Sequence, residues 1–204
     1  GYSMSDVFTT GILQRGRDGK LVEEGNGYQV DRSQRIRLGS ADPDFTMGWR
    51  HDINYKNISL GLMITGRFGG IVTSQTQAFM DAFGVSKVSA EARDNGGVML
   101  DGHRYDAERY YNTVGGQGLM SYYTYDATNV RLQELSLTYS LPKKWLGDVF
   151  NNATISFVGR NLFMFYRKAP FDPDMNGSTG TYNRSDFFMA PSLRNLGFSI
   201  KFSL

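Results

Sequence analysis

A strict alternation of apolar and polar residues occupies the C-terminal end of this chain and constrains its fold more than any other feature. From Arg194 to Leu204, apolar residues recur at every second position, for example at Phe198 and Ile200. A period of two predicts a β-strand with one apolar face and one polar face. An unpaired strand of this kind would template pairing with other chains, and a barrel removes that hazard. If the apolar face meets lipid, the barrel is an outer-membrane one. A strand of a soluble sandwich or soluble barrel is the alternative.

The same alternation recurs in several earlier segments. Gly1–Gly11 holds it only weakly, so about six strands are expected in all, fewer than the eight of the smallest usual closed barrel. A change of parity within the third clear segment predicts a β-bulge near Gln133. The clear segments are 45–55, 57–68, 130–141, 153–166 and 194–204.

Composition limits the function classes. The chain has 204 residues and a net charge of +2, which is too balanced to indicate nucleic-acid binding. It contains no cysteine, which excludes a disulfide frame and a thiol nucleophile. Its mean hydropathy is −0.38, and no apolar run is long enough for a spanning helix. Because barrel strands alternate, their mean hydropathy stays low, and 14 Phe, 12 Tyr and 24 Gly suit a barrel with aromatic girdles.

The connections between these strands alternate in length. Residues 55–57 and 142–152 form short links, whereas residues 13–43, 68–129 and 167–191 form long polar ones, the second containing a predicted short helix within 73–83. Outer-membrane barrels have short periplasmic turns and long extracellular loops. The three long segments are therefore predicted to be extracellular loops.

Strand parity assigns each side chain to a face. The apolar face is predicted to contact lipid and the polar face the lumen. The predicted lipid-facing residues are Ile58, Leu60, Leu62, Ile64, Leu135, Leu137, Phe157, Phe198, Ile200 and Phe202. The predicted lumen-facing residues are Arg50, Asp52, Arg67, Glu134, Arg160 and Lys201.

Several short motifs occur in an order typical of one protein family. They are Gly39–Phe45, Tyr55–Asn57, Arg67–Gly70, Arg93–Val98, Val130–Tyr139, Leu141–Pro142, Gly159–Phe163 and Asp172–Asp174. Together they resemble the C-terminal end of a SusC/RagA-type TonB-linked (TonB-dependent) outer-membrane transporter of the Bacteroidota. The resemblance covers nearly the whole chain. It implies an all-β fold: a transmembrane antiparallel β-barrel of about 22 strands with a plugged lumen.

In that reading, residues 1–204 are the C-terminal part of the barrel within a longer protein whose plug domain and TonB-contact segment lie elsewhere. The resemblance implies a multi-pass protein of the Gram-negative outer membrane, in contact with lipid. It implies a SusD-like surface lipoprotein and the TonB complex as partners, and a homodimer of the transporter pair as a further expectation. It implies uptake of an oligosaccharide, or otherwise of a peptide.

No catalytic constellation appears in the sequence, so no enzyme is predicted. His51 and His103 are the only histidines, and they lack the partners that nucleophilic or general-base catalysis requires. No cofactor is expected, with calcium as the one alternative. Asp172, Asp174 and Asn176 match the first half of an EF-hand loop, but its twelfth position is Asn183 instead of the bidentate Glu.

A tyrosine-rich segment in the second long loop is a candidate contact for cargo or partner, since long loops often carry binding residues. These side chains could instead pack the loop against itself. They are Tyr110, Tyr111, Tyr122, Tyr123 and Tyr125. The alternative function, from another class, is a soluble β-rich module that binds glycans through these loops.

Overall fold

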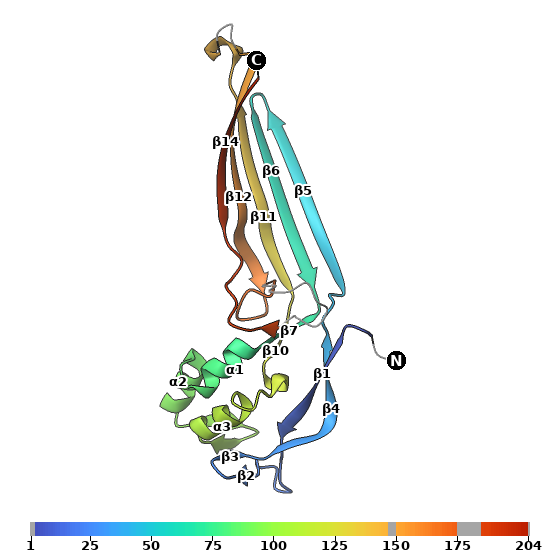
Figure 1. Cartoon of the computed structure of the whole chain (residues 1–204), viewed down its shortest axis with the longest axis vertical. Helices are drawn as coiled ribbons and strands as arrows, with labels where there is room; N and C mark the ends of the chain where they lie inside the picture. Colours follow the sequence, from blue (N-terminus) through green and yellow to red (C-terminus); the bar gives the residue numbers. More distant parts are fainter. Residues whose placement is uncertain (1–2, 147–149, 175–184, 204) are drawn as a thin grey trace. The chain divides into compact units, whose positions relative to one another are not determined.

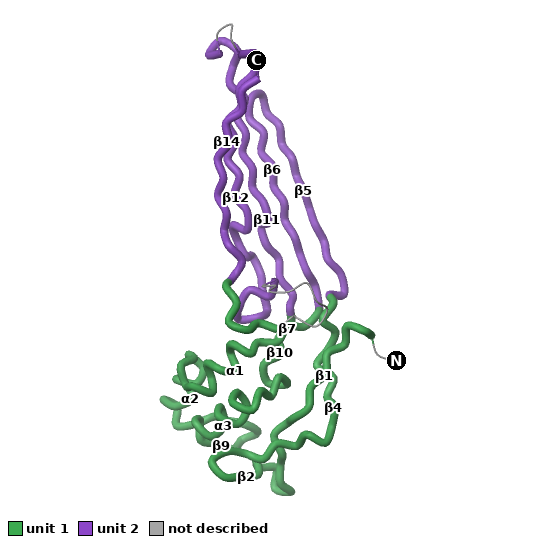
Figure 2. Tube along the Cα trace, in the orientation of Figure 1, with its two compact units in different colours: residues 1–42, 70–126, 175–190 green, residues 43–69, 127–174, 191–204 purple. Residues whose placement is uncertain are grey.

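The computed structural model describes residues 3–146, 150–174 and 185–203. The chain divides into two compact units, each built from several separate stretches of sequence (Figure 2). Unit 1 comprises residues 1–42, 70–126 and 175–190, and unit 2 comprises residues 43–69, 127–174 and 191–204.

Unit 2 is a long antiparallel sheet of five strands (Figure 1). Its strands lie in the order β14-β12-β11-β6-β5, and all neighbours are antiparallel. A short 3-10 helix, η2 (Lys143–Trp145), follows Pro142, which ends β11 because it has no N–H to donate. The strands are β5 (Phe45–Tyr55), β6 (Ile58–Phe68), β11 (Asn129–Ser140), β12 (Asn152–Arg167) and β14 (Asn195–Ser203).

The five clear strands predicted from period-two alternation are thus confirmed, each within a residue or two at its described ends. The bulge predicted near Gln133 is also present, because the pairing of β11 with both neighbours shifts between Leu132 and Glu134. On the partner strand, Asn161 takes a positive φ of 55° at the same place. Asparagine tolerates this left-handed conformation better than most residues.

Unit 1 combines small sheets with three short helices. Its elements are β1 (Asp6–Leu13), β2 (Glu23–Glu24), β3 (Gly27–Tyr28), β4 (Val30–Ser40), β7 (Ile71–Ser74), α1 (Gln75–Ala82), α2 (Lys87–Asp94), β8 (Val98–Leu100), β9 (His103–Tyr105), α3 (Ala107–Val114), η1 (Met120–Tyr122), β10 (Thr124–Asp126) and β13 (Ser185–Asp186). The predicted helix within 73–83 corresponds to α1. Its N-terminus is capped by the Ser74 side chain, which accepts a hydrogen bond from the Gln77 N–H.

Two sequence predictions fail in unit 1. Residues 13–43 were expected to form a loop, but β4 is an eleven-residue strand. Most of its residues are polar, and Val30, Ile36 and Leu38 are too few for a regular alternation, so the strand is held largely by its backbone ladder to β1. The weak strand predicted at Gly1–Gly11 forms as β1, but it pairs with β4 instead of joining the long sheet. The long sheet therefore has five described strands and not six.

The hydrophobic core of unit 1 is rich in tyrosine. Tyr28 and Tyr105 meet edge to face with ring centroids 5.6 Å apart, and Leu119 is completely buried beside them. Such edge-to-face pairs match the quadrupoles of the two rings. The Tyr105 hydroxyl reaches a polar partner, because the Leu21 N–H donates to it at 3.1 Å.

Candidate functional site

The long sheet of unit 2 has two chemically different faces, and its register shows this directly. Leu60 of β6 lies opposite Leu137 of β11, which lies opposite Phe157 of β12 and then Phe198 of β14. Residues opposite one another in a ladder point to the same face. The ten residues predicted to face lipid lie on this apolar face. Whether it contacts lipid stays a prediction.

The apolar face is exposed. Phe198 is 66% exposed and Phe202 is 62% exposed, and exposed aromatic or aliphatic residues also occur on β5, β6, β11 and β12. Soluble monomers rarely expose contiguous apolar surface on this scale. A face of this kind must be covered, and its extension over all five strands is compatible with a bilayer.

The polar face carries charged residues in opposite-sign pairs. Arg50 and Asp52 are joined at 2.8 Å, and Arg160 and Glu134 at 2.9 Å. Arg50 and Glu134 also share one row of the ladder, both lying opposite Met63. These pairs are largely exposed, so they contribute little stability. They make the face hydrophilic, as a water-facing barrel wall requires.

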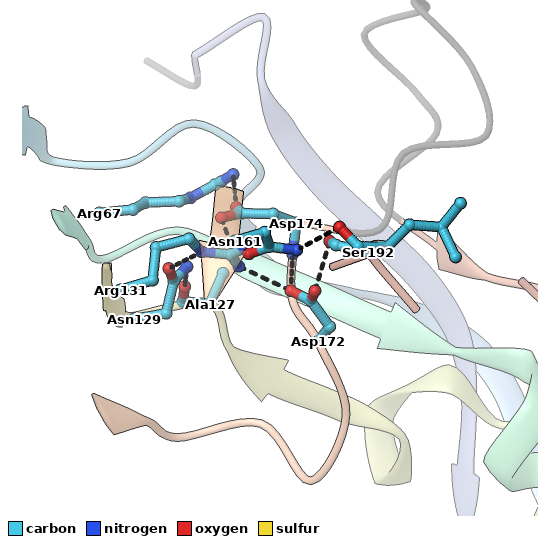
Figure 3. Close-up of polar contacts among 9 residues, drawn as sticks. Arg67, Ala127, Asn129, Arg131, Asn161, Asp172, Asp174 and Ser192 are labelled. Atoms are coloured by element: carbon cyan, nitrogen blue, oxygen red, sulfur yellow. Dashed lines mark hydrogen bonds and ion pairs between the residues drawn. The ribbon is translucent and has the colours of Figure 1, made fainter. Parts of the chain in front are cut away.

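At the long-loop end of this polar face, a buried polar network forms around Arg131 (Figure 3). Its guanidinium contacts Asp172 Oδ1 at 2.7 Å and Asp174 Oδ2 at 2.8 Å. It also donates to the side-chain oxygens of Asn129, at 3.3 Å, and Asn161, at 3.1 Å. The Arg131 side chain is only 5% exposed. Arginine suits this position because its planar guanidinium carries several donors in fixed directions.

Further contacts extend the network across the chain. Arg67 Nη1 lies 3.8 Å from Asp174 Oδ1, and the Ser192 hydroxyl donates to Asp172 Oδ2. The Asn161 side chain donates to the Leu193 carbonyl at 3.3 Å. The network thus joins β6, β11 and β12 to the segments that follow β12 and precede β14. Its arrangement fixes both ends of the connection between β12 and β14 to the strands of the long sheet.

The network shifts the pKa values of its two carboxyl groups, Asp172 and Asp174, in opposite directions. Burial raises the pKa of Asp172, but hydrogen bonds from Ser192 and Arg131 outweigh it, so the pKa ends below its usual value. Burial also raises the pKa of Asp174, and there the charge of Arg131 does not fully offset it. Because a lowered pKa favours the folded state only while the carboxylate is ionised, Asp172 stabilises the fold above the ordinary pKa of 3.8. That contribution is lost as the pH falls through the pKa of the folded state.

The calcium ligands suggested by the EF-hand match fall partly within this network. Arg131 already pairs with the carboxylates of Asp172 and Asp174, and Asn176 and Asn183 lie outside the described residues. Within the described ranges, three or more acidic or histidine side chains nowhere gather as a metal site. Calcium binding here stays a proposal.

The tyrosine prediction needs a correction. Tyr110, Tyr111 and Tyr123 are buried in the core of unit 1, so they mainly pack the loop against itself, and of the three Tyr111 also borders a hollow of this unit. Burial is also the main reason that the pKa of each is raised. Tyr122 is 37% exposed, and its hydroxyl accepts a hydrogen bond from the Leu13 N–H, while Tyr125 is half-buried.

The Arg131 network was not predicted from the sequence, although Val130–Tyr139 and Asp172–Asp174, which contain three of its residues, are among the motifs of the family resemblance. Arg131 lies opposite Thr65 on the polar face, which parity could have shown. Its pairing with carboxylates 41 and 43 positions later has no local signal.

No helix in the described part of the chain has the length and apolar character needed to cross a bilayer.

Comparison with known proteins supports the family resemblance. No family model matches the chain. The chain is 29% identical over 188 residues to TonB-dependent receptor P3 of Formosa agariphila, an alignment of 88% of this chain and 18% of the receptor. TonB-dependent receptor P26 of the same bacterium is 26% identical over 156 residues, or 74% of this chain and 15% of the receptor.

Among solved structures, the chain resembles the RagAB peptide importer in its open-open state. The TM-score is 0.61 at 17% identity, and the match covers 98% of this chain and 22% of that chain. The predicted similarity to SusC/RagA-type TonB-dependent transporters is therefore confirmed, as is the fold of a partial antiparallel barrel wall. The chain spans about a fifth of the length of these proteins.

Proposed function

We propose that this chain forms part of the wall of an outer-membrane barrel that imports a nutrient in a TonB-dependent manner. The observation that carries the proposal is the long sheet with one exposed apolar face and one hydrophilic face. The apolar face contacts lipid and the polar face lines the lumen. In this role the Arg131 network anchors the connection between β12 and β14 at the extracellular rim.

The cargo that we propose is an oligosaccharide, with a peptide as the alternative. RagAB is a peptide importer, but at 17% identity that likeness supports the fold and not the cargo. The partners that we propose are a SusD-like surface lipoprotein and, through other parts of the full-length protein, the TonB complex. A paired homodimer of the transporter is part of the same proposal.

The rival function is a soluble glycan-binding module. It would require the apolar face of the long sheet to be covered by protein, and no described element covers it. Extraction separates the two ideas, because a barrel stays in the membrane fraction until detergent is added. A soluble module is found in the soluble fraction of lysed cells without any detergent.

Uptake by living cells tests the transport itself. We expect cells with the full-length protein to take up labelled oligosaccharide, and deletion of TonB or collapse of the proton-motive force to reduce uptake to the level of cells without the protein. Binding of cargo at the cell surface should persist under both treatments, which serves as the control. Undiminished uptake without TonB would contradict the proposal.

A further inference from the structure

An open hollow of about 370 Å³, within the usual size range of ligand pockets, lies on the surface of unit 1 and is lined by residues of α1, α2 and α3 and the turns beside them. The side chains of Asp81, Phe83, Arg93, Glu108, Tyr111 and Asn112 line it. The hollow is preformed, because Ser74, Ser86 and Asp106 cap the N-termini of α1, α2 and α3 with side-chain hydrogen bonds. The helices around it are labelled in Figure 1.

The polar groups in this hollow are suited to hydroxyl ligands. Glu108 and Asn112 lie one turn apart on α3, and neither side chain bonds to another described residue. On α2, Arg93 uses one Nη1–H to donate to the Gly84 carbonyl at 2.8 Å, which fixes its position and leaves other donors available. A carboxylate, an amide and a guanidinium together accept and donate hydrogen bonds, as sugar hydroxyls do.

Phe83 adds an aromatic residue to the lining of the hollow. Phe83 ends α1 and is 77% exposed although it lines the pocket. It stacks loosely on Phe79, with nearly parallel rings 6.5 Å apart, so its orientation is restrained. A flat apolar surface beside hydrogen-bonding groups matches a pyranose ring, which has an apolar C–H face and a hydroxyl rim.

The charge of the residues that line the hollow further restricts the class of ligand that it can bind. Asp81 and Glu108 are acidic and Arg93 is basic, so two negative charges and one positive charge give a net charge of −1. Asp81 is buried and accepts a hydrogen bond from Gln77 at 2.8 Å. The negative charge of the buried Asp81 carboxylate at the hollow repels anionic ligands. Sulfated or uronic-acid sugars are therefore disfavoured relative to neutral ones.

A peptide fits this lining poorly. One common way for a protein to bind an extended peptide is to add it as a strand to a sheet edge, where main-chain groups pair. The walls here belong to α1, α2 and α3 and the turns beside them, and helix backbone groups already bond to one another. We propose that this hollow binds one ring of a neutral oligosaccharide, stacked on Phe83 and bonded to Glu108, Asn112 and Arg93. The proposal rests on the import function above and specifies its cargo class.

The test measures binding of neutral hexaoses to the detergent-solubilised full-length protein. Cellohexaose, mannohexaose and maltohexaose are compared with their chemically sulfated forms and with a pool of hexapeptides. At least one neutral hexaose should bind, and its sulfated form should bind more weakly. Phe83→Ala should lower affinity for the neutral hexaose roughly tenfold by removing the stacking surface. Glu108→Gln should narrow the gap between the neutral and sulfated forms.

Met99→Ala is the control, because Met99 of β8 is an exposed apolar residue of the same unit that does not line this hollow. It should leave the affinity unchanged, and heat-modifiable mobility should show that all variants are folded. Equal affinity of the wild type and Phe83→Ala for the neutral hexaose would overturn the proposed binding site. It would leave the proposed TonB-dependent import unaffected. Binding of hexapeptides without any neutral hexaose would overturn the cargo class.

Discussion

Replacing Arg131 with methionine is expected to reduce folding stability by about 3–5 kcal/mol, because the substitution leaves two carboxylates without their main partner. Asp172 is nearly buried, with 11% of its side chain exposed, and Asp174 is partly buried. Methionine keeps much of the length of arginine, so packing changes little while the charge is lost. Urea titration of the full-length protein in lipid vesicles, followed by heat-modifiable mobility, measures the loss.

Arg160→Met provides the matched control. It removes an arginine from the same sheet face, but Arg160 is 64% exposed and its partner Glu134 can be solvated by water. Its effect should be close to zero. Adding Asp172→Asn and Asp174→Asn to Arg131→Met should recover part of the loss, since the unpaired charges disappear. Equal effects of Arg131→Met and Arg160→Met would show that the network does not stabilise the sheet.

Phe198→Arg is expected to lower the yield of folded barrel, because a charge on the lipid face costs about 2–4 kcal/mol at the bilayer midplane. Phe198 lies in the middle of β14, opposite Phe157, in the row that also holds Leu60 and Leu137. The folded fraction in outer-membrane preparations measures the effect.

Ser199→Arg is the control for this prediction. Ser199 is the next residue of β14 and lies opposite Ser156 on the polar face. The same charge should be tolerated there because water reaches it in the lumen. If both substitutions lowered the folded yield equally, the two faces would not differ in environment.

The parts of the fold that sequence predicted are those with a local signal. Period-two alternation identified the long sheet, and a change of parity located the bulge beside Gln133. The strand β4 was missed because most of its residues are polar, with only Val30, Ile36 and Leu38 among them, while ladder hydrogen bonds to β1 hold it in place. Alternation of apolar and polar residues indicates a strand with one buried face, so it gives little signal for a strand made mostly of polar residues.

The candidate sites depended on tertiary packing and were predicted less well. The number of tyrosines in a loop does not reveal which of them become core, and Tyr110 and Tyr111 are buried by the packing of α3 within unit 1. The Arg131 network joins residues from five separate parts of the chain, as far apart as Arg67 and Ser192. Sequence marked Asp172 and Asp174 as unusual, but only the fold shows that an arginine lies between them.

The sidedness of the long sheet in a bilayer is the most direct test of the account. The chain has no cysteine, so single cysteines can carry nitroxide labels in the reconstituted full-length protein. The labels are compared in neighbouring pairs from opposite faces of three strands. The pairs are Leu60 with Ser59, Leu137 with Ser136, and Phe198 with Ser199. Labels at Leu60, Leu137 and Phe198 should be relaxed mainly by lipid-soluble oxygen, and their neighbours mainly by a water-soluble nickel chelate. The reverse pattern would mean that the apolar face is a protein core and that the chain is not part of a membrane barrel.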